Sequence, residues 1–226
     1  MPEGLSLERP EPTIGLLTLT RSERKNALSI ALRDEMSVAL DDLASDEALK
    51  AVVVTGAGDT FCAGFDLGEF ETAFADEAYA ARLWDSSDRW HRRVLRFPLP
   101  TIAAVNGPAL GGGFDLAVMC DVRVASTTAR FAHPEYAFGD VVYTPLHDIV
   151  GGATARELCL TGRSVDATEA LTMRLVSQIV DQGSVVEHAL ETARRIAVAP
   201  RANLMRTKAK AARLAGNDVD AATLDL

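Results

Sequence analysis

Two glycine-containing loops carry the residue types that could do chemistry in this chain. The first, FCAGFDL at residues 61–67, follows the apolar run at 51–55, and the second, NGPALGGGFDL at 106–116, follows the apolar run at 101–105. Three consecutive glycines that open a helix allow close backbone approach and present unpaired N–H groups at the positive end of the helix dipole. The second loop therefore predicts a site that stabilises negative charge.

The glycine triplet has two other interpretations. A dinucleotide fingerprint needs glycines spaced G-x-G-x-x-G, and Gly107, Gly111, Gly112 and Gly113 do not have that spacing. A glycine-rich turn that only packs a helix on a strand remains open on the triplet alone.

The elements that position these loops follow from hydrophobic patterning. Strands are expected at 13–20, 51–55, 101–105 and 122–125, the first of them in an N-terminal hairpin. Helices are expected at 28–43 with Ser29 as N-cap, at 75–96, and from the glycine triplet to about residue 120. Alternating strands and helices indicate βαβ units in an α/β fold, so both loops leave the carboxyl ends of parallel strands, where such sheets bind ligands.

Beyond Gly162 the chain is expected to be helical. Asp166 and Glu169 form a D-x-x-E helix start, and further helices are expected at 184–198 and 200–214. We expect one continuous domain, with a core at 1–160 and a helical C-terminal region at 161–226.

Composition restricts the function. The 226 residues carry a net charge of −9, which argues against nucleic acid as a partner. Cys62, Cys120 and Cys159 are widely spaced and predict neither a disulfide framework nor a metal site. The chain shows no signal-peptide pattern and no apolar run long enough to cross a membrane, so a cytoplasmic protein is expected.

Two basic clusters stand out on this acidic chain. They are Arg21, Arg24 and Lys25 in an early loop, and Arg201, Arg206, Lys208, Lys210 and Arg213 on a late helix. They are interpreted either as solvated surface charge or as a binding site for a small phosphorylated ligand.

Together the segments resemble the crotonase superfamily, the enoyl-CoA hydratase/isomerase family. The similar segments occur in the family's order over roughly residues 7–210: RSERKNALS, AVVVTGAGDTFCAGFDL, PTIAAVNGPALGGGFDLAVMCDVRVAS, ARFAHPE and ELCLTGRSVDATEAL. The resemblance implies a crotonase-like (ClpP/crotonase) spiral of ββα units, an acyl-CoA thioester as substrate, no metal or redox cofactor, and a homotrimer or hexamer.

The resemblance also implies roles for individual residues. Backbone N–H groups of Ala63 and Gly112 would form an oxyanion hole for the thioester, with Gly64, Phe65 and Asp66 lining the substrate loop. Lys25, Ala27 and Leu28 would meet the nucleotide end of CoA.

Two carboxylates match the family's acid–base positions. Glu135 has the usual length, but Asp115 stands where hydratases have glutamate, and the missing methylene withdraws the carboxylate by roughly 1.5 Å. Hydration and double-bond isomerisation both remain open, with Glu135 as the main proton-transfer group. His133 is interpreted as a packing or rim residue.

The segment 140–149 also departs from the family, which leaves the shape of the acyl pocket open and makes Asp140 and Tyr143 replacement candidates. A non-catalytic acyl-CoA binding protein, or another crotonase-type activity such as a hydrolase or decarboxylase, is the alternative.

Overall fold

A six-stranded sheet forms the body of the molecule in the computed structural model, which describes residues 4–137, 139–216 and 222–225. The antiparallel edge strand β1 pairs with β2, and the remaining pairs are parallel. The spatial order is β1 (Leu5–Glu11), β2 (Ile14–Leu19), β3 (Ala51–Gly56), β4 (Thr101–Val105), β6 (Val122–Ser126) and β9 (Gln178–Val180). The expected N-terminal hairpin is confirmed, and β3 and β4 are parallel neighbours, in agreement with the expected βαβ units.

Strands β3 and β4 at the centre of this sheet are buried on both faces, which explains their continuous apolar runs. Val53 and Ile102 point to one side, where they pack with Val185 and Ala189 of helix α8 (Val185–Ala197). Val52 and Val54 alternate to the other side. That side holds the larger core, which includes side chains from helices α1 (Ile30–Ser45) and α3 (Glu77–Arg96).

A smaller ladder holds the two glycine-containing loops. Strand β5 (Ala109–Leu110) pairs with β7 (Arg130–Ala132), and β7 pairs with β8 (Val165–Asp166). Single bridges join Cys62 to Ala109 and Leu28 to Phe65. Segments around residues 28, 65, 110 and 132 therefore lie side by side, although the sequence separates them widely.

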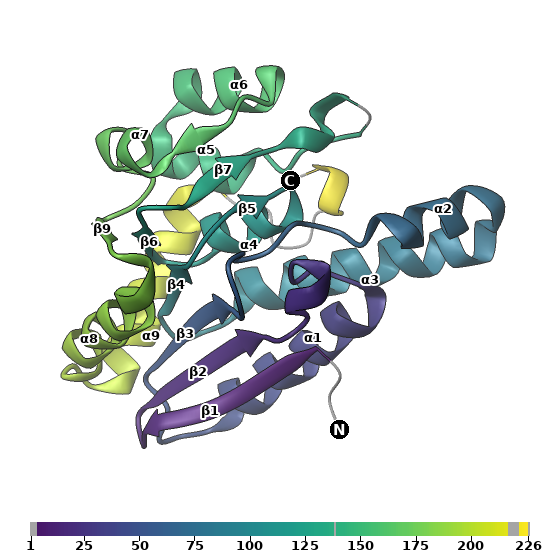
Figure 1. The fold of residues 1–226 in the computed structure, drawn as a ribbon. Coiled ribbons are helices and arrows are strands. Elements are labelled where there is room, and N and C mark those ends of the chain that lie inside the picture. Colours follow the sequence, from purple (N-terminus) through teal and green to yellow (C-terminus); the bar gives the residue numbers. More distant parts are fainter. Residues whose placement is uncertain (1–3, 138, 217–221, 226) are drawn as a thin grey trace.

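The remaining helices surround these sheets (Figure 1). Helix α2 lies alongside α3, and the two extend together from the body. The bounds are α2 (Leu67–Ala75), α4 (Gly112–Met119), α5 (Thr144–Val150), α6 (Gly152–Thr161), α7 (Ala167–Thr172) and α9 (Arg201–Ala215), with 3₁₀ turns at Ser22–Arg24, Pro134–Ala137, Gln182–Ser184 and Thr223–Asp225. None of the described helices combines the length and apolar composition that crossing a membrane requires.

The helix expected at 75–96 is confirmed as α3. A separate helix, α2, precedes it, and the Asp76 carboxylate starts α3 by accepting from the N–H groups of Ala78 and Tyr79. One expectation about the elements needs correction. The C-terminal region is mostly helical, but its segments β8 and β9 join the sheets. Two- and three-residue strands lack a readable alternation, so long-range pairing alone defines them.

Candidate active site

The backbone of the first loop has a positive φ at Gly64, which sets the directions of the N–H groups around it. The Ala63 N–H donates to the Lys25 carbonyl at 3.0 Å, and on the far side of Gly64 the Asp66 N–H donates to the Leu28 carbonyl at 3.3 Å. Phe65 forms a parallel bridge with Leu28 through the groups on either side of it, so the Phe65 N–H itself points away from Leu28. The φ of +92° at Gly64 breaks the regular alternation, which lets the Ala63 N–H face the same side as the Asp66 N–H. No described group accepts a hydrogen bond from the Phe65 N–H.

This geometry corrects the role expected for Ala63. An oxyanion donor must be free to bind the developing negative charge, and the Ala63 N–H is already engaged. Phe65, expected only to line the loop, carries the amide that is available.

The second amide is at the start of α4. Gly112 is the first residue of this helix, where N–H groups have no partner within the helix. A Cβ added to Gly112 would lie 2.7 Å from Cδ1 of Phe65, so glycine is what allows the two loops to approach this closely. The free amides of Phe65 and Gly112 thus belong to segments in direct contact.

The two predicted carboxylates meet at the glycine triplet. Asp115 lies buried in the first turn of α4, and Glu135 follows β7 in the 3₁₀ turn. The Nδ1 atom of His133 is 2.9 Å from Oε1 of Glu135 and 3.8 Å from Oδ1 of Asp115. A Cβ built on Gly111 would be 3.1 Å from Oε2 of Glu135. The carboxylates therefore share one neighbourhood with the Gly112 amide.

His133 is a fully buried member of this group, which the interpretation as a packing or rim residue missed. Burial opposes its charged form, but the hydrogen bond to Glu135 and the charges of Asp115 and Glu135 outweigh burial and raise the pKa of His133. Its position two residues before Glu135 is a sequence signal that His133 lies near that carboxylate. The contact of the imidazole with Asp115 is set by the fold alone. An imidazole between two carboxylates can hold a proton that either may exchange.

The residues expected at the nucleotide end of CoA divide into two groups. Lys25 is exposed and its Nζ lies 3.0 Å from Oδ1 of Asp59. Leu28 is fully buried and forms the bridge to Phe65, while the Ala27 carbonyl accepts from Arg21. Only Lys25 of these three presents a charge to solvent, so Ala27 and Leu28 support the loop.

Asp66 also supports the loop. Its carboxylate accepts from the Gly68 N–H at the start of α2 and pairs with Arg21 at 3.1 Å. Arg21 and Asp66 therefore fix the point where the first loop leads into α2.

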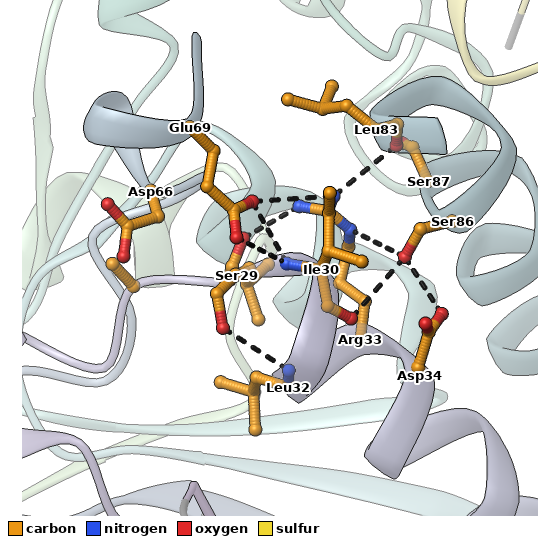
Figure 2. A network of polar contacts seen from close by, with 12 residues as sticks. Ser29, Ile30, Leu32, Arg33, Asp34, Asp66, Glu69, Leu83, Ser86 and Ser87 are labelled. Carbon is orange, nitrogen blue, oxygen red and sulfur yellow. Dashed lines mark hydrogen bonds and ion pairs between the residues drawn. The ribbon is translucent and has the colours of Figure 1, made fainter. Parts of the chain in front are cut away.

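Arg33, a buried arginine outside the sequence motifs, lies in a network of polar contacts next to this loop (Figure 2). Arg33 donates to the Leu28 carbonyl at 2.7 Å and to the Leu83 carbonyl at 3.3 Å, and its guanidinium lies 4.4 Å from the centre of the Phe65 ring. Glu69 of α2 accepts from the Ile30 N–H and lies 3.9 Å from Arg33. Burial lowers the pKa of Arg33 to about 10, which leaves it charged at neutral pH.

Other sequence candidates have structural roles or lie apart. On α9, Arg201 donates to the carbonyls of Leu49 and Ala44, and Lys208 pairs with Asp121. Asp140 is exposed, and the partly buried Tyr143 packs against the core.

The cysteines are free and buried, and burial raises the pKa of Cys62 to about 12 and of Cys120 and Cys159 to about 11. They are therefore poor nucleophiles. Within the described residues, no three His, Cys, Asp or Glu side chains are arranged to hold a metal ion.

Comparison with known proteins places this geometry in a family. The family model described as enoyl-CoA hydratase/isomerase matches residues 9–225. A putative enoyl-CoA hydratase of Thermus thermophilus is 39% identical over 201 residues, covering 86% of this chain and 79% of that protein. A probable enoyl-CoA hydratase of Rhizobium meliloti is 40% identical over 188 residues, covering 81% and 72%.

Solved structures of proteins in the same family have the same fold as this chain. A protein of Magnetospirillum magneticum described as an enoyl-CoA hydratase/carnithine racemase superimposes with a TM-score of 0.87 at 30% identity, covering 96% of this chain and 85% of that one. A monofunctional enoyl-CoA isomerase of M. smegmatis superimposes with a TM-score of 0.79 at 32% identity, covering 98% and 96%. The expected crotonase-like fold is confirmed. The chain belongs to the enoyl-CoA hydratase/isomerase family of the crotonase superfamily and is an enzyme of that family.

Proposed function

We propose that this enzyme adds water to the double bond of a 2-enoyl-CoA thioester. The observation that carries the proposal is the convergence of Glu135 and Asp115 on His133, beside the glycine triplet that supplies the Gly112 amide. Two carboxylates facing one space can hold a water and also supply the proton that completes the addition.

The proposed hydration moves one proton from water to C2 and one hydroxyl group to C3. Glu135 takes a proton from water as the water oxygen bonds to C3, and the electron pair of the double bond moves toward the thioester oxygen. The N–H groups of Phe65 and Gly112 stabilise that oxyanion, and a carboxyl group then returns a proton to C2. Removing one oxyanion donor from other enzymes costs about 10²–10³ in rate, so this pair supplies a large share of catalysis.

Isomerisation of a 3-enoyl-CoA is the second candidate. It needs one carboxylate to move a proton between two carbons, and Glu135 is the full-length carboxylate at the site. The shorter Asp115 favours this alternative, because a misplacement of about 1 Å can cost about 10² in rate.

The test incubates the protein with crotonyl-CoA and, separately, with a 3-enoyl-CoA, and follows the products by mass spectrometry. Hydration adds one water to the product mass, whereas isomerisation leaves the mass unchanged and shifts the double bond. Binding of both thioesters without product formation would favour a non-catalytic acyl-CoA binding protein, and release of free CoA would favour a hydrolase.

The nucleotide end of CoA is proposed to lie near Lys25, whose exposed ammonium can contact a phosphate once its pair with Asp59 opens. No cofactor beyond the CoA of the substrate is proposed, and the enzyme is proposed to act in the cytoplasm.

A homotrimer or hexamer is proposed as the assembly. It is supported by exposed apolar side chains on C-terminal helices, among them Leu160 and Leu214 at 75% and 82% exposure. Sedimentation equilibrium tests it, and a monomer mass would contradict it.

A further inference from the structure

A second histidine, His91 of α3, lies behind Asp115. Its side chain is 1% exposed, and its Nδ1 is 3.0 Å from the Ser87 carbonyl and 3.1 Å from Oγ1 of Thr223. A carbonyl oxygen only accepts hydrogen bonds, so Nδ1 carries the proton and Nε2 is the basic nitrogen of the neutral ring.

The Nε2 atom of His91 faces Asp115. It lies 3.9 Å from Oδ2 of Asp115 and, like Oδ1 of that carboxylate, is buried without a hydrogen-bond partner among the described residues. Since Oδ1 is 3.8 Å from Nδ1 of His133, Asp115 lies between two imidazoles. A histidine serving only to fill the core normally has its buried polar atoms satisfied, and this one has a free nitrogen directed at an acid–base group.

Among the described residues, Asp115 is the ionisable side chain that lies within 4.0 Å of Nε2 of His91. Trp90 packs edge-on at 4.5 Å between ring centres, and Phe65 lies 6.3 Å away. Asp88 reaches this region only through the Thr223 N–H, to which its carboxylate is hydrogen-bonded at 2.8 Å.

We propose that His91 is a positioning residue that orients Asp115 and exchanges a proton with it. In the proposed hydration Glu135 takes the proton of the attacking water, and Asp115 is the carboxyl group that delivers its own proton to C2. The proton held by Glu135 then moves through His133 to Asp115, which exchanges it with Nε2 of His91. The resulting imidazolium keeps its Nδ1–H on the Ser87 carbonyl and its Nε2–H toward the carboxylate of Asp115. Return of the proton to Asp115 restores the neutral ring. This role rests on the proposed function. It explains how Asp115, one methylene shorter than the glutamate of hydratases, can still take part in proton transfer at this position.

The kinetic test uses His91→Asn, whose amide can still donate to the Ser87 carbonyl but has no Nε2. We expect kcat for crotonyl-CoA hydration to fall roughly 10²-fold, the low end for a group in acid–base catalysis, with KM within a few-fold. The pH profile of kcat should lose one ionisation. His188→Asn, at a half-buried histidine on α8, is the matched control and should behave as wild type.

A double-mutant cycle decides whether His91 acts through Asp115. If it does, His91→Asn combined with Asp115→Asn is no slower than Asp115→Asn alone. Additive losses, or an unchanged kcat and pH profile in the folded single variant, overturn the proposal.

An activity-independent readout separates this proposal from the proposed function. Side-chain ¹⁵N NMR of the resting enzyme should show His91 protonated on Nδ1, and Asp115→Asn should change the Nε2 shift of His91 but not that of His188. A wild type that turns over no enoyl-CoA yet gives this NMR result refutes the proposed function alone. An Nε2–H tautomer of His91, or no response to Asp115→Asn, refutes the role of His91.

Discussion

Single side chains at the site differ in how far they can reach. Glu135 places one carboxylate oxygen on His133 and leaves the other buried and unpaired beside the glycine triplet, while Asp115 has the shorter side chain. We therefore expect Glu135 to carry out most of the proton transfer.

Glu135→Gln keeps the shape of the side chain and removes its ability to take a proton. We expect kcat to fall by about 10²–10⁴, with acyl-CoA affinity within a few-fold, and Asp115→Asn to cost less. Steady-state kinetics and calorimetry measure both. The exposed Glu23→Gln is the control, and wild-type rates of Glu135→Gln on every enoyl-CoA would assign the base elsewhere, to His133, Asp140 or Tyr143.

His133 makes folding stability depend on pH in a defined direction. Its pKa is raised in the folded protein, so its contribution to the free energy of unfolding is fully present below its unfolded pKa of about 6.5 and is lost as pH rises through the folded value. Urea unfolding of wild type and His133→Gln should give a stability difference that shrinks from pH 6 to pH 9. A difference that grows with pH would contradict the imidazolium between the two carboxylates.

At the scale of elements, the proposed oxyanion hole depends on the approach of α4 to the loop at Gly64 and Phe65. Gly112→Ala puts a methyl group into the Phe65 ring and should separate the two amides. Loss of one donor predicts a kcat lower by about 10²–10³. Gly183→Ala is the matched control, because its Cβ would meet nothing within 4 Å, and equal rates of the two variants would argue against these amides.

Arg33 connects α1, α3 and the Phe65 loop, and a lysine cannot reproduce its fork of donors. Arg33→Lys should lower the free energy of unfolding by about 1.5–3 kcal/mol, the range for hydrogen bonds to charged groups. It should also lower kcat, because Arg33 holds the Leu28 carbonyl that fixes the loop. Arg82→Lys, at an exposed arginine on α3, should change neither, and an Arg33→Lys variant that is destabilised but has wild-type kcat would limit Arg33 to a structural role.

At the scale of the whole molecule, CoA must approach a protein of net charge −9 through a local positive site. Lys25→Ala should raise the Kd of an acyl-CoA by about five-fold or less, since exposed charge pairs contribute little. Asp59→Asn should tighten binding, because it frees Lys25 and removes a negative charge. Calorimetry in low and high salt measures both. Lys210→Ala is the control. If Lys25→Ala binds acyl-CoA with unchanged affinity at low salt, the nucleotide of CoA binds away from Lys25.

The sequence by itself determined the elements whose signals are local. Continuous apolar runs predicted β3 and β4, and the glycine triplet predicted the start of α4 with its unpaired N–H groups. The resemblance to the family marked Gly112, Glu135 and Asp115. These features depend on residue type and spacing along one short segment, which is the information that a sequence carries directly.

The tertiary structure decided which groups meet and which are free. Phe65 rather than Ala63 offers its amide because Gly64 breaks the regular alternation and the neighbouring segment engages the Ala63 N–H. His91 and Asp115 come together only through the packing of α3 and α4, and β8 and β9 exist only through pairing with distant strands. A hydrogen bond or a contact belongs to two segments at once, so neither segment's sequence can specify it alone.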